Sequence, residues 1–506
     1  MSLKVLLSKI YAKRVYYQTQ FWANNPVVTQ QKVFQDLIRQ ANVTQFGKDH
    51  RFSEIKNIQD FQKQVPIRDY EALRPYIDRV VAGEKDILWK GKPIYFAKTS
   101  GTTSGAKYIP LTKESMPTHI EAARTAILLY IHETKKAAFV DGKMIFLQGS
   151  PILEEKNGIK IGRLSGIVAH FIPKYLQKNR MPSWQTNCIE DWETKVNAVV
   201  EETFNQNMTV ISGIPSWVQM YFEKLQIKTQ KPVGELFPNF NLFIYGGVNF
   251  EPYRAKFENI IGRKVDSIEL FPASEGFFAY QDSQSEKGML LLLNSGIFYE
   301  FIKSDEFFTD PDGSKPKRYT IGEVELNVNY VLIISTNAGL WAYNIGDTIQ
   351  FTSLKPYRVI VSGRIKHYIS AFGEHVIGKE VECAMKEAMA NTNISINEFT
   401  VAPQINPKLG LPYHEWFIEF DSEASEEPLD IQAFATAINN EMRKQNIYYD
   451  DLIVGKVLQD LVITKVAKNG FQDYMKSIGK LGGQNKVPRL SNDRKIADLL
   501  GIIIKE

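Results

Sequence analysis

The sequence predicts an α/β protein with a large N-terminal domain and a small, mobile α+β domain at the C-terminus. Apolar segments of strand length alternate with helical segments between residues 144 and 276, which is typical of a parallel sheet flanked by helices. From residue 277 to residue 363 short apolar segments follow one another with almost no helix between them, which indicates antiparallel strands. Beyond residue 376 helical and strand segments alternate again over the length of one small domain.

Length and composition narrow the class of protein. The 506 residues exceed the usual length of one domain, roughly 100–200 residues. We therefore predict two domains, residues 1–362 and 363–506, with a hinge near residues 362–368. The net charge is +4, no basic run indicates nucleic acid, and the two cysteines lie far apart, which fits a reducing compartment. With no signal peptide and no apolar segment of membrane-spanning length, we expect a cytoplasmic monomer without nucleic-acid or membrane partners.

Helical patterns fill the first 83 residues. Residues 2–45 predict two helices, the second with Val33, Leu37 and Ala41 on one face. A further helix follows Asp69, a suitable N-cap, and ends at Gly83. We expect this region to form a packed platform.

The stretch YFAKTSGTTSGAKYIPL, residues 95–111, begins as a buried strand and continues with seven residues, 99–105, that are all Ser, Thr or Gly. Such a loop suits phosphate, because glycines let the backbone come close and the hydroxyls and a following lysine can contact phosphate oxygens. It is not a P-loop, since Ala106 and Tyr108 stand where that motif needs glycine and a hydroxyl residue. A flexible polar turn is the alternative. The candidate phosphate-binding residues are Thr99, Ser100, Gly101, Thr102, Thr103 and Lys107.

The remaining elements follow from the same patterns. A helix is expected from Ser115 to Glu133. Parallel strands are predicted at 144–148, 209–215, 241–247 and 267–276, with helices at 191–205 and 216–225. Antiparallel strands are predicted at 277–281, 289–294, 297–302, 320–326, 330–336, 340–351 and 357–363. In the C-terminal domain we predict helices at 377–389 and 429–444 and strands at 399–402, 416–420 and 462–466.

Ligands bind at the carboxyl ends of parallel strands, so the residues that follow such strands are candidates for a site. Glu275 follows a predicted strand and can bind Mg²⁺ through a carboxylate oxygen, although a solvated loop glutamate is the alternative. Asp347 follows Gly346 within an apolar strand pair and can accept both hydroxyls of a ribose, or it belongs to a hairpin turn. Arg364 can reach ribose or phosphate, and Lys366 lies at the predicted hinge, unless both belong to an exposed basic linker.

In order and spacing these four segments resemble the phosphate loop, the Tyr-x-x-[ST]-Glu segment, the Gly-Asp ribose segment and the hinge segment of the adenylate-forming superfamily. Within it, VPIRDYEALRPYI and GGQNKVPRL are most similar to the Gretchen Hagen family of acyl-acid amido synthetases, the auxin- and jasmonate-conjugating type. The family's Tyr-Ala-Ser-Ser-Glu corresponds to residues 271–275, and its Tyr-Arg-x-Gly-Asp to residues 343–347, where Asn344 replaces the arginine.

The resemblance implies that the chain uses ATP and Mg²⁺ to turn a carboxylic acid into an acyl-adenylate, which an amine, in this family an amino acid, then converts to an amide. It implies adenylate-forming catalysis by Glu275 and by Lys486, a lysine on a mobile loop unless it is an ordinary surface residue. Arg124, on the helix from Ser115, is the candidate for the acyl carboxylate. Further nucleotide contacts are expected from Gly246, Gly247, Phe271, Ala273 and Ser274.

Two rival functions stay open. A ligase of the same superfamily would hand the acyl group to coenzyme A, and a non-catalytic nucleotide-binding protein would keep only the fold. The seven histidines and two cysteines show no zinc-binding spacing, and the serine-hydrolase motif G-x-S-x-G is absent.

Overall fold

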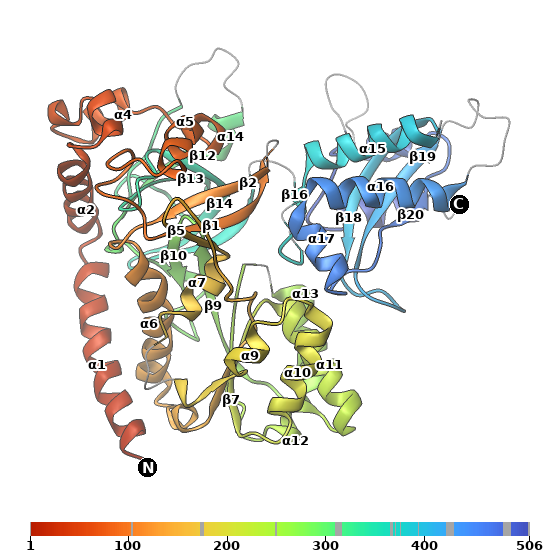
Figure 1. Cartoon of the computed structure of the whole chain (residues 1–506), viewed down its shortest axis with the longest axis horizontal. Coiled ribbons are helices and arrows are strands. Elements are labelled where there is room, and N and C mark those ends of the chain that lie inside the picture. Colours follow the sequence, from red (N-terminus) through yellow and green to blue (C-terminus); the bar gives the residue numbers. More distant parts are fainter. Residues whose placement is uncertain are drawn as a thin grey trace. The chain divides into compact units, whose positions relative to one another are not determined.

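The computed structural model describes residues 2–102, 105–172, 177–247, 250–308, 316–364, 368–369, 371–374, 376–392, 394–420, 430–478 and 487–503. The chain divides into two compact units (Figure 1). The first comprises Met1–Thr99, Lys107–Glu190 and Lys195–Ile365, and the second Ser100–Ala106, Asp191–Thr194 and Lys366–Glu506. The predicted fold class is confirmed, while the domain limits at 362 and 363 stay a prediction.

Helices form the start of the large unit, as the sequence predicts. Asp69 caps one of them, since its Oδ1 accepts a hydrogen bond from the backbone N–H of Ala72 at 3.0 Å. That helix ends at Val81, shortly before Gly83, whose φ of +95° suits glycine. The helices are α1 Leu3–Ala23, α2 Pro26–Ala41, α3 Gln45–Asp49, η1 Phe52–Glu54, α4 Ile58–Gln64, α5 Tyr70–Val81 and α6 Met116–Thr134.

The predicted parallel and antiparallel regions join in one continuous sheet. Its described strands have the order β12-β13-β14-β15-β11-β10-β9-β8-β7-β3-β6. Strand β9 pairs in parallel with β8 and antiparallel with β10, so the change of direction occurs at this strand. The parallel part contains β3 Lys143–Phe146, β6 Arg180–Met181, β7 Met208–Ser212, β8 Leu242–Gly246 and β9 Asp266–Ala273. The antiparallel part contains β10 Gly276–Tyr280, β11 Met289–Leu291, β12 Ile297–Lys303, β13 Asn329–Thr336, β14 Tyr343–Leu354 and β15 Tyr357–Arg364.

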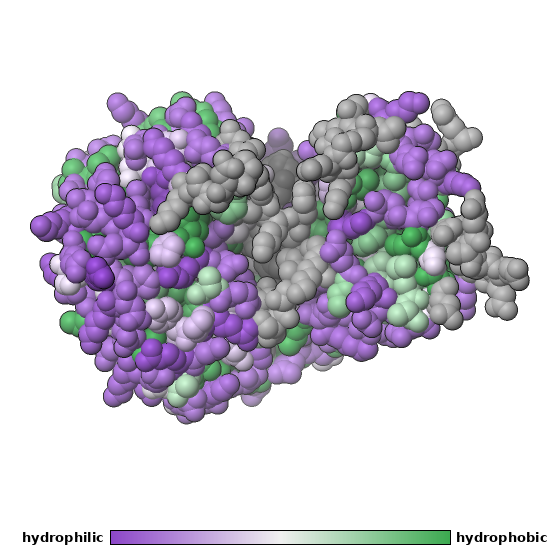
Figure 2. Space-filling view, turned by 90° about the horizontal axis from the view of Figure 1, so that it is seen from above, coloured by the Kyte–Doolittle hydropathy of each residue, from purple (hydrophilic) through white to green (hydrophobic). Residues whose placement is uncertain are grey.

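Helices α7 Leu164–Ala169, α9 Trp184–Asn187, α10 Trp192–Thr203, α11 Pro215–Thr229, α12 Val233–Leu236 and α13 Glu251–Ile261 connect the parallel strands, and the short helix η2 Ala138–Asp141 precedes β3. Helix α14 Ser304–Phe308 follows β12. On the face shown in Figure 2, hydrophilic residues cover most of the described surface of the large unit, and apolar residues are scattered between them.

One expected strand of the antiparallel region is absent from the described residues. Residues 320–326 form turns rather than a strand, because the backbone N–H and the hydroxyl of Thr320 both donate to Glu323 and compete with strand pairing. A small sheet has the order β2-β1-β5-β4, and the sequence predicted only the start of its strand β1, at residues 95–97. Its strands are β1 Tyr95–Thr102, β2 Gly105–Leu111, β4 Glu154–Lys156 and β5 Ile159–Gly162.

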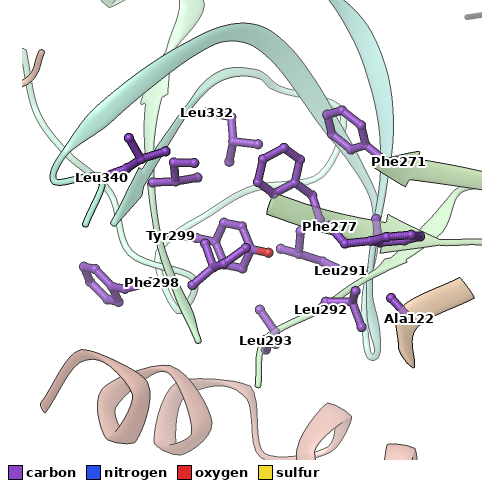
Figure 3. Close-up of a cluster of buried hydrophobic side chains, with 14 of the residues drawn as sticks. Ala122, Phe271, Phe277, Leu291, Leu292, Leu293, Phe298, Tyr299, Leu332 and Leu340 are labelled. Carbon is purple, nitrogen blue, oxygen red and sulfur yellow. The ribbon is translucent and has the colours of Figure 1, made fainter. Parts of the chain in front are cut away.

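The antiparallel part of the sheet curls around an apolar core. Figure 3 shows side chains of β9 to β13 gathered there with Ala122 of α6. The rings of Phe278 on β10 and Tyr299 on β12 are 6.4 Å apart, although four strands, β13, β14, β15 and β11, lie between β12 and β10 in the order of the sheet. A Cβ atom on Gly276 would lie 2.6 Å from Cδ1 of Ile297, so the start of β10 touches the start of β12. The curl therefore brings the end of β9 toward the outermost strand.

Gln30 of α2 supports that outermost strand. Its buried amide donates to the carbonyl oxygens of Leu293 and Ile297, at 2.7 and 2.9 Å, and accepts from the N–H of Tyr299 at 2.9 Å. Phe301 and Tyr319 exchange two further backbone hydrogen bonds, of 2.9 and 2.7 Å. These contacts satisfy backbone groups of β12 that do not face β13.

The second unit has the expected α+β composition. Strands β18 Ile396–Gln404, β19 Tyr413–Phe420 and β20 Val462–Lys465 form its sheet, and β16 Tyr368–Ile369 pairs with β17 Val376–Ile377. Its helices are α15 Gly378–Thr392, α16 Ile431–Gln445, α17 Ile447–Val454, α18 Gly470–Ser477 and α19 Lys495–Ile503. All the helices and strands predicted here from the sequence are present.

Candidate functional site

The segment expected to be a phosphate loop is mostly strand. β1 continues to Thr102 and β2 begins at Gly105, so only residues 103–104, which lie outside the described residues, separate the two strands. The expected seven-residue loop was therefore wrong. Threonine favours strands, and pairing with the neighbouring strands outweighs the turn-like composition. Thr99 lies in β1 and is half-buried, and the side chains of residues 100–103 are not among those described.

The side chain of Tyr70 supports the start of β2. Its hydroxyl accepts a hydrogen bond from the backbone N–H of Tyr108 at 2.9 Å, and Nζ of Lys107 lies 5.5 Å from the centre of its ring. Tyr70 is buried, and burial is the main cause that raises the pKa of its hydroxyl to about 12. The hydroxyl is therefore neutral at physiological pH, and the position of Lys107 depends on a buried tyrosine of α5.

The residues just before Tyr70 pair with the strand that carries Asp347. The N–H of Arg68 donates to the carbonyl of Ala342 at 3.0 Å, and the N–H of Asn344 donates to the carbonyl of Arg68 at 2.8 Å. Residues 68–70 thus contact both β2, which carries Lys107, and the start of β14. This role was not predictable from the sequence, in which the motif VPIRDY that contains these residues is its only signal.

Asp347 lies in a bulge of β14 rather than in a hairpin turn. Val331 pairs with Thr348 and Ile333 with Asn344, so residues 345–347 of β14 lie opposite the single residue 332 of β13. Gly346 has φ of +87°, which permits this local bend. Asp347 is 6% exposed and lies opposite Arg364 in the pairing of β14 with β15. The two predicted ribose contacts therefore occupy paired backbone positions, although the side chain of Arg364 is outside the description.

Asn344, which replaces the arginine of the family motif, has a structural role here. Its Oδ1 accepts a hydrogen bond from the backbone N–H of Gly346 at 2.9 Å. The amide therefore stabilises the bend that precedes Asp347.

Glu275 lies on a tight hairpin between β9 and β10. Ala273 pairs with Gly276, so Ser274 and Glu275 alone form the connection. Glu275 and Ser274 are partly exposed, whereas the ring of Phe271 is buried, 5.1 Å from the ring of Phe278. As predicted, the carboxylate follows the carboxyl end of a parallel strand.

Gly246 brings the end of β8 against this hairpin. A Cβ atom at Gly246 would lie 2.5 Å from the carbonyl oxygen of Leu270 and 3.2 Å from Cδ of Pro272, both on β9. Gly247 follows with φ of +83°, and no other part of the described chain lies within 4 Å of its Cβ position. The carboxyl ends of β8 and β9 are therefore adjacent, with open space beside Gly247.

Of the three remaining predicted site residues, the structure describes only Arg124. Arg124 is partly exposed on α6, where its Nη2 lies 3.6 Å from Oε1 of Glu121, and its buried Nε has no hydrogen-bond partner among the described residues. Lys366 and Lys486 lie outside the described residues. The chain just after Lys486 is anchored to β18, because Thr400 donates to the carbonyl of Pro488 at 2.7 Å.

The described residues contain no cluster of three or more potential metal ligands. When a nucleotide is bound, proteins usually hold Mg²⁺ through one or two carboxylates together with phosphate oxygens. Glu275 is a carboxylate of this kind, at the end of a parallel strand.

Three models of one family match consecutive parts of the chain. The GH3 family N-terminal domain matches residues 17–189, the GH3 family central domain residues 290–364, and the GH3 family C-terminal domain residues 379–495.

Individual proteins are similar as well. Jasmonoyl-L-amino acid synthetase JAR4 of Nicotiana attenuata is 23% identical over 480 residues, which cover 79% of this chain and 80% of that protein. Indole-3-acetic acid-amido synthetase GH3.15 of Arabidopsis thaliana is 44% identical over 77 residues, 15% of this chain and 13% of that protein.

Solved structures share the fold. The AtGH3.15 acyl acid amido synthetase in complex with 2,4-DB has a TM-score of 0.60 at 17% identity, covering 97% of this chain and 96% of that one. A 2-hydroxyisobutyryl-CoA ligase in complex with 2-HIB-AMP and CoA has a TM-score of 0.60 at 13% identity, covering 96% and 92%.

Proposed function

The chain belongs to the GH3 family, and we propose from this membership that it is an acyl-acid amido synthetase, which uses ATP to join a carboxylic acid to an amine. The amine that we propose is an amino acid, because a similar protein is named as a jasmonoyl-L-amino acid synthetase.

One structural observation carries most weight for the proposal. Residues 68–70 bind the backbone of β2 next to Lys107 and the backbone of β14 just before Asp347. Two motifs that lie far apart in the sequence are thereby held by one short segment, as a nucleotide that spans phosphate and ribose contacts would require.

In the first proposed step, a carboxylate oxygen of the acid attacks the α-phosphorus of ATP, and the bond to pyrophosphate breaks. Negative charge grows on the phosphate oxygens, so fixed cations and donors lower the barrier. We assign this role to Lys107 and to Lys486, and ribose binding to Asp347 and Arg364. Glu275 would hold Mg²⁺, which supplies further positive charge at the phosphates.

In the second proposed step, the amine nitrogen attacks the acyl carbon, AMP leaves, and the amine loses a proton. The C-terminal domain, residues 363–506, would present a different surface in each step by rotation at the hinge near Lys366. We also propose a cytoplasmic location, which the free thiols of Cys188 and Cys383 support.

The decisive experiment measures ATP–pyrophosphate exchange with a panel of carboxylic acids. We expect at least one acid to start the exchange, and Asp347→Ala to weaken it through a higher KM for ATP. A purified, folded protein that exchanges pyrophosphate with no acid of the panel, and binds no ATP, would refute the adenylation step.

Product analysis then identifies the acceptor. With mixed amino acids we expect an amide, whereas an acyl thioester formed only with coenzyme A would favour the ligase alternative. The fold resemblance to a CoA ligase makes this comparison necessary. ATP binding without either product would leave the non-catalytic alternative.

A further inference from the structure

Helix α1 has apolar side chains on two opposite faces. The inward face, which includes Ala12, Val15 and Trp22, is buried. The outward face is also apolar, but its side chains are 55–78% exposed. We define the outer face of α1 as Leu3, Leu7, Ile10, Tyr17 and Phe21.

The outer face is one stripe that Arg14 interrupts. Its residues lie four or three positions apart except between Ile10 and Tyr17, where Arg14 takes the intervening position, and this is the spacing of a helix that packs along its length against another surface. At about 100° per residue they fall within an arc of roughly 80°, and they extend over about 27 Å of helix. Val27 and Val28 at the start of α2 are also exposed apolar residues, at 53% and 67%. An apolar stripe of this size differs from the single exposed apolar residues that occur on most proteins.

Positive charges border the stripe. Lys4 and Lys13 are exposed on its two sides, and Arg14 is exposed within it. Helix α1 contains no aspartate or glutamate. Ser2, the N-cap of α1, donates a hydrogen bond to Asp141 at 2.7 Å, before the stripe begins.

This charge pattern distinguishes between two possible occupants. A second copy packed through the same face would bring like charges from both helices together, with no acidic residue of α1 to compensate. An anionic lipid surface complements both features, because long basic side chains can reach lipid phosphates while the apolar side chains enter the boundary of headgroups and acyl chains.

We propose that the outer face of α1 binds the surface of an anionic membrane, with the helix lying in the plane of the interface. No helix among the described residues is long and apolar enough to cross a membrane, and binding at the surface requires none. We expected no membrane partner because the sequence has no apolar segment of membrane-spanning length, a reason that does not apply to binding at the membrane surface. The helix packs against α6 on its other side, so the unit can rest on the membrane without unfolding (Figure 1).

The test is flotation of the full chain with lipid vesicles. We expect wild type to bind vesicles of mixed phosphatidylcholine and phosphatidylglycerol, to leave pure phosphatidylcholine unbound, and to dissociate as salt rises. Replacing two charges in Lys13→Gln/Arg14→Gln should lower binding about 25-fold, since each cation near an anionic surface contributes about a fivefold factor. Leu7→Gln/Ile10→Gln/Phe21→Gln should lower it by more than about 100-fold.

Matched controls use apolar residues that are equally exposed elsewhere. Ile227 on α11 and Leu409 are 72% and 89% exposed, and Ile227→Gln and Leu409→Gln should bind vesicles as wild type does. Circular dichroism checks that each variant is folded. If the triple apolar variant is unfolded, vesicle binding by Lys13→Gln/Arg14→Gln alone decides whether the proposal holds.

Three outcomes would overturn the proposal. The first is wild type that binds no anionic vesicles, and the second is an equal loss of binding in the control variants. The third is a dimer in analytical ultracentrifugation that the triple variant converts to a monomer, without vesicle binding, which would assign the face to a second copy.

Discussion

Replacing Tyr70 with phenylalanine removes one atom at the point where α5 supports β2. The phenol oxygen accepts the hydrogen bond from the N–H of Tyr108 at 2.9 Å, and the ring below Lys107 remains in the variant. Tyr70→Phe therefore isolates the contribution of the hydrogen bond from that of the ring.

The expected loss of stability is modest. A neutral hydrogen bond contributes about 0.5–1.5 kcal/mol, and a partly buried N–H without a partner adds to the loss, so we expect about 1–2 kcal/mol. Because burial raises the pKa of the Tyr70 hydroxyl to about 12, the group stays protonated, and the difference from wild type should be constant between pH 6 and pH 9.

The effect on the reaction should be larger. If Lys107 contacts phosphate, a displaced β2 weakens a charge-assisted contact worth about 1.5–3 kcal/mol, so the KM for ATP in pyrophosphate exchange should rise about tenfold or more. Tyr76→Phe is the matched control on the same helix, because it removes a hydroxyl that donates to Asp49 at 2.8 Å, away from β2. Its KM for ATP should equal that of wild type.

Two results would refute this reasoning. If Tyr70→Phe exchanged pyrophosphate with the KM of wild type, the hydrogen bond would not position Lys107. If Tyr76→Phe raised the KM equally, the effect would reflect a general loosening of α5.

Further predictions concern the strand ends, acid stability and a buried ion pair. Gly246→Ala places a methyl group 2.5 Å from a backbone oxygen, so it should abolish pyrophosphate exchange. Gly247→Ala has space for the methyl group, and its positive φ should lower the free energy of unfolding by only about 1–2 kcal/mol. Equal exchange activities of the two variants would contradict this prediction. Burial lowers the pKa of His119 from 6.5 to about 4. As the pH falls from 6.5 to 4, the imidazole of His119 is protonated in the unfolded chain before it is protonated in the folded one, so the free energy of unfolding should drop by about 3 kcal/mol. Urea titrations at pH 7 and pH 4 should show this loss in wild type and not in His119→Met. Asp282 accepts two hydrogen bonds from Arg358, at 2.9 and 2.8 Å, and both side chains are 10% exposed. Asp282→Ala should cost about 3–5 kcal/mol in urea denaturation, and a loss below about 1 kcal/mol would show that the arginine finds another partner.

The order of helices and strands was predictable because it depends on local periodicity. The alternation before residue 277 and its disappearance afterwards correspond to the parallel and antiparallel parts of the sheet. The position of Glu275 after β9 followed from the same pattern, since the apolar segment ends at a short polar one.

The extent of β1 was not predictable in this way. Composition favours a loop at 99–105, but a strand beside other strands gains hydrogen bonds that composition does not report. The bulge before Asp347 has a similar origin, because it depends on how β14 pairs with β13.

The role of residues 68–70 depends on contacts between segments that are distant in the sequence. The residues around Tyr70 do not indicate that its hydroxyl accepts a hydrogen bond from the N–H of Tyr108. A single sequence shows that the residues suit a helix start, and only the fold shows what else they hold.

The amide of Gln30 has a consequence for the behaviour of the protein at high concentration. An outermost strand with free N–H and C=O groups is a template on which another chain can add a strand and start aggregation. Here Gln30 binds the carbonyl of Ile297 and the N–H of Tyr299, and the backbone of Tyr319 binds both backbone groups of Phe301. These groups are therefore not available to pair with a strand of another chain. A nonpolar residue in place of Gln30 would reopen it, and the first sign would be growth of intermolecular β-structure rather than loss of the fold.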